Sequence, residues 1–274
     1  MRVTVWGSRG SIASAGPETV RYGGNTACVS VESDDAICIL DAGSGLRRAG
    51  LDFAGDARPI HLLLTHLHMD HIQGLGFFRP LFEPGRTIHV WGPPSTTQDL
   101  RTRLTRYLSP PLFPVRIRDF GAHVTLHDAP LAPWLADGLE ISAAAVIHPG
   151  PTLGYRITSG GRSIAYLPDH EPALGGSIGR PAWTSGHDLA ASADLLIHDG
   201  QYTGEEYAQR VGWGHSTVAH AVALADLVGA ERLVLFHHEP DHSDEVVDRM
   251  LAAARSDRRR GSTDAASEGM TIEL

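Results

Sequence analysis

Hydrophobic and polar positions divide the chain into short apolar runs, many of which end at Gly, Asp or His. Short runs of this kind, bounded by turn-forming residues, are typical of buried strands. The expected strands are Val3–Trp6, Ala27–Val31, Ala36–Leu40, Ile60–Leu64, Thr87–Trp91, Ile141–Ile147, Leu153–Ile157, Ser163–Leu167, Leu195–Ile197, Leu233–Phe236 and Met270–Leu274.

Three segments show helical spacing of their apolar residues instead. Thr96–Leu108 carries Leu on one face and is preceded by Ser95, with Gln98 at capping-box spacing. Thr217–Val228 has an apolar side and is followed by Gly, which favours a helix end. Ser243–Arg255 opens with Ser, Asp and Glu, the residues that favour a helix N-terminus.

The order of these elements indicates an α/β protein. Strands come first in hairpin-like pairs and later alternate with helices, which favours two sheets packed face to face with helices outside. Between the last helix and the last strand, the polar stretch Arg255–Glu268 is expected to be a mobile loop. No repeat or Pro/Ser-rich linker divides the chain, so we expect one domain spanning residues 1–274.

Composition limits the class of protein. A formal net charge of −9 repels polyanions and disfavours a nucleic-acid duplex as a stable partner. No apolar stretch approaches the roughly 20 residues of a membrane helix, and the first residues resemble a strand rather than a signal peptide. We therefore expect a soluble, cytoplasmic protein with no membrane partner. Cys28 and Cys38 are expected to be buried, reduced thiols without a metal-binding role.

The segment Thr65–His71 concentrates potential metal ligands directly after the strand-like run Ile60–Leu64. It offers His66, His68, Asp70 and His71 on the turn that follows a buried strand, where α/β folds place their chemistry. A single His there is more often an ordinary surface residue. Imidazole and carboxylate donors without thiolate suit zinc, manganese or iron, so the cluster predicts a metal site.

Three further ligand candidates stand where other apolar runs stop. His148 follows Ile141–Ile147, Asp169 follows Ser163–Leu167 across a proline, and His237 follows the run that ends at Phe236. Each alone is typical of a solvated strand end. Together with the first cluster, they supply the ligands that two metal ions require.

This constellation resembles that of the metallo-β-lactamase superfamily, whose His-x-His-x-Asp-His signature is present as residues 66–71. The resemblance covers nearly the whole chain and implies a four-layer αββα sandwich with both metals at one edge of the sheets. It assigns His66, His68 and His148 to the first metal, Asp70, His71 and His237 to the second, and Asp169 to a bridge between them. It also implies that Asp70 accepts a hydrogen bond from a metal-bridging hydroxide and aims this nucleophile.

Two later segments resemble loops of the ribonuclease Z branch. Gly214–Thr217 reads Gly-His-Ser-Thr, and His198–Gln201 stands where that branch has His-Glu-Ala-Thr, which is a departure. The resemblance implies that His215 is a general acid for the leaving oxygen and that Asp199 orients it. The alternative is that His215 is merely exposed beside a helix N-terminus capped by the Ser and Thr hydroxyls.

The chain also departs from the tRNA-processing members, which carry a long exosite arm before the bridging Asp. Here the stretch Pro149–Pro168 reads as a simple hairpin with Ser159–Gly161 at its turn. The short form is more similar to small-molecule members, such as phosphoribosyl cyclic phosphodiesterases and cyclic-nucleotide phosphodiesterases.

Other features leave two interpretations each. The loop Gly7–Ser11, with Arg9, is either an anion-binding loop or a set of tight turns. The apolar tip Tyr107–Pro114 is a lid, a subunit interface in a homodimer, or an ordinary Pro-rich turn. Additional histidines beside the ligand positions are expected to support the ligands or face solvent, namely His170, His238 and His242.

The sequence therefore predicts a dinuclear metal-dependent hydrolase. The favoured function is a phosphodiesterase that acts on a small cyclic or exposed phosphodiester through a metal-bridging hydroxide, with two divalent ions, zinc before manganese or iron. One alternative is thioester or lactone hydrolysis on the same metals. Another is a metal-bearing sensor without turnover.

Overall fold

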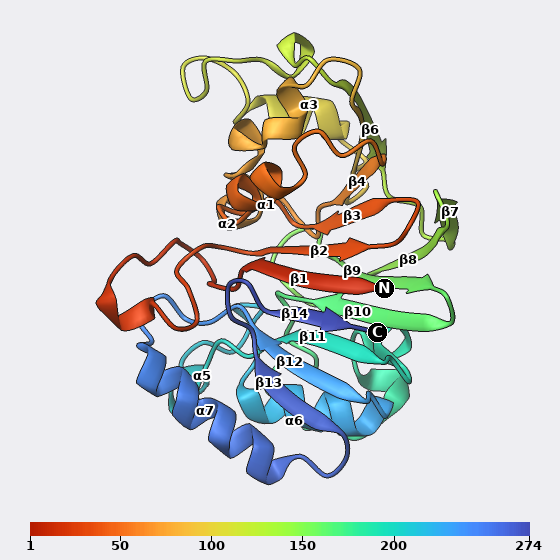
Figure 1. Ribbon diagram of the computed structural model, residues 1–274. Helices are drawn as coiled ribbons and strands as arrows, with labels where there is room; N and C mark the ends of the chain where they lie inside the picture. Colours follow the sequence, from red (N-terminus) through yellow and green to blue (C-terminus); the bar gives the residue numbers. More distant parts are fainter.

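The structure, a computed structural model that describes residues 1–274, contains two seven-stranded mixed sheets that pack face to face (Figure 1). The first sheet has the order β14-β1-β2-β3-β4-β5-β6. Its strands are β1 Arg2–Gly7, β2 Cys28–Glu32, β3 Ile37–Leu40, β4 Ile60–Leu63, β5 Thr87–Gly92, β6 His123–Asp128 and β14 Thr271–Glu273. Strands β14 to β3 pair antiparallel, and β3 to β6 pair parallel.

The second sheet has the order β13-β12-β11-β10-β9-β8-β7 and repeats this division. Its strands are β7 Trp134–Ala136, β8 Leu139–Ala145, β9 Leu153–Ser159, β10 Arg162–Leu167, β11 Leu195–Asp199, β12 Arg232–Phe236 and β13 Ser262–Ala265. Strands β7 to β10 pair antiparallel, and β10 to β13 pair parallel.

Helices cover the outer face of each sheet (Figure 1). The chain has seven, namely α1 Leu46–Asp52, α2 Met69–Ile72, α3 Leu100–Thr105, α4 His187–Ala190, α5 Gly204–Tyr207, α6 Val218–Val228 and α7 Asp244–Asp257. Residues of α1, α2 and α3 pack on the first sheet, and those of α4, α6 and α7 pack on the second. The predicted αββα sandwich is confirmed. No helix of the structure has both the length and the apolar character that crossing a bilayer requires.

Three apolar cores fill the three interfaces between these four layers. Alternation along β3 shows how one strand serves two of them, since Cys38 and Leu40 face the other sheet while Ile37 and Ile39 face the helices. Cys28 faces the helices, so it lies on the opposite side of the sheet from Cys38. Both thiols are buried and free, as predicted, and burial raises the pKa of each.

All eleven expected strands are present, but three edge or near-edge strands were missed. β6, β7 and β13 are short or rich in polar residues, so their apolar pattern is weak. The prediction of a mobile loop over Arg255–Glu268 was wrong. α7 runs on to Asp257, and β13 pairs in parallel with β12. The Arg232 guanidinium on β12 donates hydrogen bonds to the Asp264 carboxylate on β13, so polar pairing secures this strand.

Of the three predicted helix starts, those of α6 and α7 were confirmed and that of α3 was wrong. α6 begins after Thr217, whose hydroxyl accepts a hydrogen bond from the His220 amide, and ends at Gly229, which adopts φ +69°. α7 follows Ser243 as expected. α3, however, begins only at Leu100. Asp99 caps it by accepting from the Thr102 amide, and the Ser95 capping box does not form.

The ends of the parallel strands determine where chemistry takes place. β3, β4, β10, β11 and β12 all end at the same edge of the sandwich, and a polar residue or ligand-bearing loop follows each of them. Open parallel sheets bind their ligands at this carboxyl edge.

Candidate metal centre and active site

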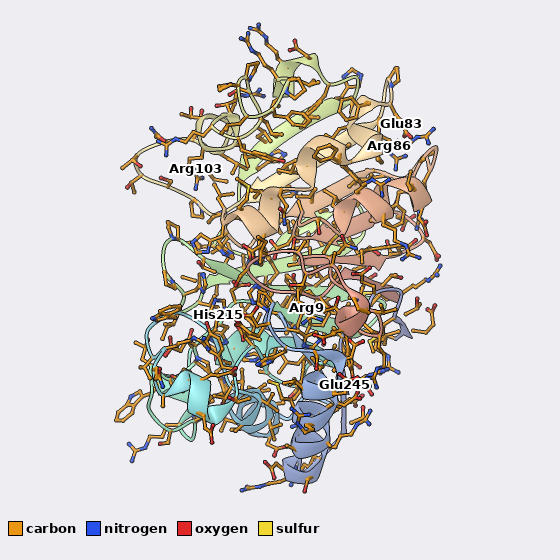
Figure 2. All side chains as sticks on the ribbon, turned by 90° about the vertical axis from the view of Figure 1, so that its left-hand side faces the viewer. Arg9, Glu83, Arg86, Arg103, His215 and Glu245 are labelled. Carbon is orange, nitrogen blue, oxygen red and sulfur yellow. The ribbon has the colours of Figure 1, made fainter.

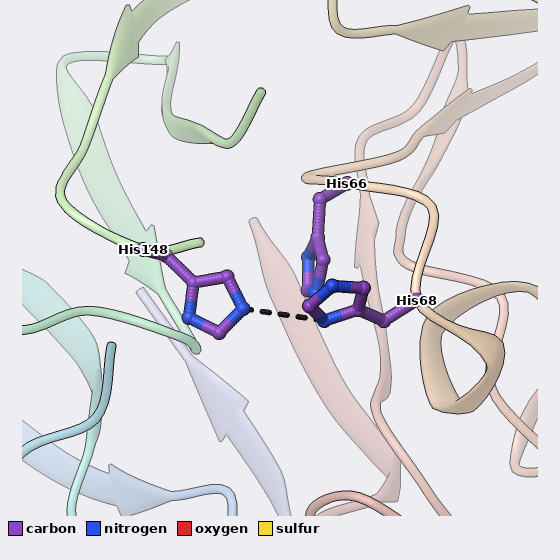
Figure 3. Close-up of side chains that lie close together, drawn as sticks. All are labelled: His66, His68 and His148. Atoms are coloured by element: carbon purple, nitrogen blue, oxygen red, sulfur yellow. Dashed lines mark hydrogen bonds between the residues drawn. The ribbon is translucent and has the colours of Figure 1, made fainter. Parts of the chain in front are cut away.

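Three imidazoles from two distant segments meet at this edge. His66 and His68 come from the loop between β4 and α2, and His148 follows β8 (Figure 3). The ring centroid of His66 lies 4.3 Å from that of His68 and 4.7 Å from that of His148. His68 Nδ1 and His148 Nε2 are 3.3 Å apart. The three rings can therefore present nitrogens to one ion.

A second group lies directly beside the first. It joins Asp70 and His71 of α2 to Asp169 after β10 and His237 after β12. His71 Nε2 is 3.0 Å from Asp169 Oδ1, and His237 Nε2 is 3.2 Å from Asp70 Oδ2 and 3.3 Å from Asp169 Oδ2.

Asp169 connects the two groups. Besides its contacts in the second group, its Oδ2 lies 3.8 Å from His66 Nε2 and 3.9 Å from His148 Nε2. One carboxylate thus faces imidazoles of both groups, which is the position that the family resemblance implies for a bridging ligand. All seven predicted ligands lie together.

The donor atoms fit divalent metal ions. His66 Nε2, His71 Nε2 and Asp169 Oδ1 are buried and have no hydrogen-bond partner within the protein. Buried polar atoms are normally hydrogen-bonded, because leaving one unsatisfied costs about 1–3 kcal/mol. Several such atoms converging on one point indicate that their lone pairs serve another partner. Imidazole and carboxylate donors without thiolate suit zinc, manganese or iron.

Neighbouring groups shift the pKa values of the candidate ligands in different directions. Burial opposes protonation of His71 and His237, but nearby carboxylates, Asp169 first, outweigh it and raise both pKa values, so these two rings release a proton when a metal binds. Burial lowers the pKa of His66 and of His148, which keeps these imidazoles neutral and able to ligate. Burial also opposes ionisation of Asp169, but the neighbouring histidines, His237 first, outweigh it and hold the pKa well below the usual range. The carboxylate therefore stays ionised.

Hydrogen bonds to the far ring nitrogens orient the imidazoles. His148 Nδ1 donates to the Gly214 carbonyl at 2.9 Å, and His71 Nδ1 donates to Asp41 Oδ2 at 2.8 Å. In both rings Nε2 is then the nitrogen that faces the cluster. Such outer partners fix the tautomer and raise the basicity of a ligating His.

Asp41, which we did not predict from the sequence, holds the loop that follows β4 and the candidate ligand His71 in place. It lies directly after β3, has φ +59° and is fully buried. Its carboxylate accepts hydrogen bonds from the Thr65 amide and hydroxyl, from the Tyr166 hydroxyl and from His71. A signal was present, because Asp41 is a polar residue directly after an apolar strand, as the predicted ligand His148 is.

The Gly7–Ser11 loop supports the centre instead of binding an anion through Arg9. The Arg9 guanidinium is buried and donates to the carbonyls of Gly23, Glu239 and His242. The Ser11 amide donates to Asp70 Oδ2 at 2.8 Å. Of the two interpretations, the structure favours tight turns that position Asp70.

His215 and Asp199 form a pair next to the metal ligands. His215 Nδ1 donates to Asp199 Oδ2 at 2.7 Å, and the His215 ring stacks on His237 with centroids 4.9 Å apart. Asp199 is fully buried at the end of β11 and also accepts from the amides of His170, Gln201 and Ser216. The shorter Asp thus reaches its His. A carboxylate with four donors is a rigid orienting group.

The loop that carries His215 has a second support that the sequence did not reveal. Glu171 is buried and accepts hydrogen bonds from the amides of Gly212 and Gly214 and from the Tyr207 hydroxyl. Gly214 has φ +89°, and a β-carbon there would collide with the His148 ring. No pattern in the sequence distinguishes Glu171 from an ordinary acidic residue.

The additional histidines are buried instead of facing solvent, and their rings bond to groups other than the predicted ligands. His170 Nδ1 donates to His198 Nε2 at 2.9 Å, His238 Nε2 donates to the Ala266 carbonyl, and His242 Nε2 contacts Glu206. None belongs to a cluster that could hold a third metal.

The apolar tip Tyr107–Pro114 folds back over the edge of the centre. Tyr107 donates from its hydroxyl to the Gln73 carbonyl, and Phe113 is buried against Phe77, while Leu112 stays 67% exposed. Tyr107 and Leu112 line a pocket of 440 Å³ that reaches the first group of ligands. The tip is thus part of the wall of this site.

Comparisons with known proteins agree with this geometry. The family model described as "Beta-lactamase superfamily domain" matches residues 38–238. The chain belongs to this superfamily. It is 28% identical to ribonuclease Z of Myxococcus xanthus, over 91% of this chain and 92% of that protein, and 30% identical to ribonuclease Z of Mycolicibacterium paratuberculosis, over 82% and 80%.

Solved structures of superfamily members show the same fold. YhfI of Bacillus subtilis, described as a metallo-β-lactamase fold protein, has a TM-score of 0.72 at 20% identity and 99% coverage of both chains. A diphosphatase of the PhnP family has a TM-score of 0.70 at 21% identity, over 100% of this chain and 97% of that one. The chain is therefore a metal-dependent hydrolase of the metallo-β-lactamase superfamily, related to ribonuclease Z, and its His/Asp clusters bind divalent metal.

Proposed function

We propose that this superfamily member is a phosphodiesterase that uses two divalent metal ions and acts on a small phosphodiester. The observation that carries the proposal is the His215–Asp199 pair, held at 2.7 Å beside two groups of ligands that share Asp169. Hydrolysis of a phosphodiester or of a lactone, unlike that of a thioester, expels an alkoxide-like oxygen that needs a proton. A positioned acid next to a metal pair suits this reaction.

Zinc is the metal that we propose first, with manganese and iron as alternatives, because five imidazoles and two carboxylates offer the nitrogen-rich donors that zinc accepts. Divalent ions at such a site supply Lewis acidity and lower the pKa of a coordinated water toward ~7, which provides the nucleophile at neutral pH.

The protein's own groups then complete the reaction. Because His215 Nδ1 donates to Asp199, its Nε2 is the nitrogen available to a substrate, and the carboxylate holds the ring in this orientation. As the phosphorus–oxygen bond to the leaving group breaks, Nε2–H gives its proton to that oxygen. Asp70, which the Ser11 amide holds in place, stays ionised and accepts the hydrogen bond that orients the attacking water.

Small substrates are favoured by the shape and charge of the chain. β9 and β10 are joined by a two-residue turn at Gly160 and Gly161, so no arm extends between His148 and Asp169. The net charge of −9 also disfavours a long polyanion. The second candidate is RNA cleavage, which the ribonuclease Z relatives favour. The third is hydrolysis of a thioester or lactone on the same metals.

The test is a substrate comparison on metal-loaded protein whose metal content is measured. We expect about two ions per chain and turnover of p-nitrophenyl phosphodiesters and nucleoside cyclic phosphates, with little activity on acyl thioesters, lactones or a structured RNA. His66→Ala should lose metal and activity together. The matched control His123→Ala, at an exposed position of β6, should keep both. Preferential turnover of an acyl substrate or of RNA would replace the proposal with the corresponding alternative.

A further inference from the structure

The pocket beside the first group of ligands has features that the reaction itself does not need. It encloses 440 Å³, a volume typical of sites for small organic ligands, and His66 and His68 form its inner end. Met69, Tyr107 and Leu112 contribute apolar wall. We call it the α3 pocket, because α3 and the tip that follows it form its outer side. Figure 2 shows Arg103 of α3 on the same side of the molecule as His215.

The charge of the α3 pocket is opposite to that of the whole protein. The chain carries a net charge of −9, yet the residues that line this pocket include Arg103 and Arg106 and no Asp or Glu. Arg103 is committed elsewhere, because it donates to the Pro93 carbonyl and contacts Asp128. Arg106 is exposed and donates only to the neutral Gln98 side chain at 2.9 Å. Its charge is therefore available to an anion.

The position of the candidate acid shows which part of a substrate enters this pocket. His215 does not line it and lies beyond His148, with ring centroids 5.0 Å apart. A leaving group that His215 protonates must depart on that side. The α3 pocket, which His215 does not line, is then left for the arm that stays on phosphorus.

We propose that the α3 pocket binds the retained arm of the substrate and selects an aromatic or other apolar group that ends in an anion, with Arg106 as the specificity-determining residue. This inference rests on the proposed phosphodiesterase function and adds the substrate class. The apolar wall buries the planar part of the arm, and Arg106 pairs with the terminal anion at the outer end.

Three substrates test the inference, since all release p-nitrophenolate and differ only in the retained arm, which is methyl, phenyl or 4-carboxyphenyl. For the unaltered protein we expect kcat/KM to rise roughly tenfold from methyl to phenyl through apolar burial. We expect a further rise of about fivefold from phenyl to 4-carboxyphenyl through the charge pair. Equal values for the three substrates would overturn the proposal.

Matched variants assign each increase to a residue. Arg106→Gln should abolish the preference for 4-carboxyphenyl over phenyl, while Arg101→Gln, at an exposed arginine of α3 outside the pocket, should preserve that preference. Leu112→Ala should reduce the preference for phenyl over methyl. Leu131→Ala, at a similarly exposed leucine elsewhere, should not. An unchanged carboxylate preference in Arg106→Gln, or an equal loss in Arg101→Gln, contradicts the assignment.

A binding measurement separates this inference from the proposed function. Calorimetry on the metal-loaded protein compares 4-carboxyphenyl phosphate with phenyl phosphate, and neither needs to turn over. We expect the carboxylated ligand to bind about fivefold more tightly, and Arg106→Gln to remove this difference. If the preference appears without any hydrolysis of phosphodiesters, the proposed function fails and the pocket assignment stands. If hydrolysis occurs without the preference, the pocket assignment fails alone.

Discussion

At the scale of single residues, burial of neutral histidines makes folding depend on pH. His198 is fully buried, donates from Nδ1 to the Asp199 carbonyl and accepts from His170. Burial lowers its pKa to about 4. An unfolded His has a pKa of ~6.5 and takes up a proton first as the pH falls, so this contribution to stability is present above about pH 6.5 and lost on the way down to about pH 4.

We therefore expect His198→Gln to flatten the acid dependence of stability. From pH 7 to pH 5, protonation of this group in the unfolded chain removes about 2 kcal/mol from the unfolding free energy of the unaltered protein. Urea unfolding of the unaltered protein and of the variant at the two pH values measures this change in unfolding free energy. Titration of the candidate metal ligands contributes equally to both proteins and cancels in the comparison. The same slope in the variant would show that His198 does not control acid stability.

Residue positions also show how far the sequence could predict the site. The seven candidate ligands could be proposed because each stands at the end of an apolar run or within the His-x-His-x-Asp-His motif, whereas Asp199 and His215 were proposed from the resemblance to ribonuclease Z loops. Asp41 obeys the same rule and was overlooked. Glu171 could not be found, because its role depends on amides of Gly212 and Gly214 that the fold alone brings to it.

At the scale of elements, the loop Gly212–Thr217 is the part that positions the candidate acid. Glu171 fixes its first half and Asp199 its second, through hydrogen bonds to the backbone. Because Asp199 holds both the Ser216 amide and the His215 ring, and Glu171 holds the backbone just before them, a displacement of the loop moves His215 relative to the metal ligands. Misplacement by about 1 Å can cost around 10²-fold in rate.

Glu171→Gln should consequently lower kcat by roughly 10-fold or more while KM changes little. The amide keeps the shape of the side chain but replaces one acceptor oxygen with a donor that faces backbone N–H groups. Glu205→Gln, at an exposed acid of α5, is the control and should leave kcat unchanged. Steady-state kinetics with metal content measured in parallel checks this, and an unaltered kcat in Glu171→Gln refutes the positioning role.

Elements differ in how well the sequence predicts them for a physical reason. Central strands such as β3 and β11 are buried on both faces, so their apolar runs are continuous and easy to detect. β13 is an edge strand that reads Ser-Thr-Asp-Ala and gains its place through pairing with β12 and the ion pair from Arg232. Tertiary contacts, rather than local pattern, decide such a segment.

At the scale of the whole molecule, the ligands join the two sheets. His66, Asp70 and His71 belong to the first-sheet half, whereas His148, Asp169 and His237 follow strands of the second. Bound metal therefore ties the sheets together across the edge of the sandwich. The order of elements along the chain already favoured two sheets packed face to face, and the family resemblance added the edge that carries the metals. The order of strands within each sheet could not be predicted, because it is not written in the hydrophobic pattern.

Removal of metal should accordingly lower the thermal unfolding temperature. A ligand that binds only the folded state contributes about 4 kcal/mol when present at 1,000 times its dissociation constant. Scanning calorimetry of chelator-treated protein, before and after addition of zinc, should show a loss and a recovery. Calcium at equal concentration should restore nothing, because imidazoles are poor calcium ligands. Identical unfolding temperatures with and without zinc would show that no metal joins the sheets.

The central claim is that His215 protonates an oxygen leaving group, and a comparison of two leaving groups tests it most directly. p-Nitrophenyl phenyl phosphate and diphenyl phosphate share a retained arm but expel an easily and a poorly departing phenolate. We predict that His215→Ala, with its metal content intact, lowers kcat for diphenyl phosphate by about 10²–10⁴-fold and affects the nitrophenyl ester far less. Equal losses on both substrates, or no loss on either, would contradict the account.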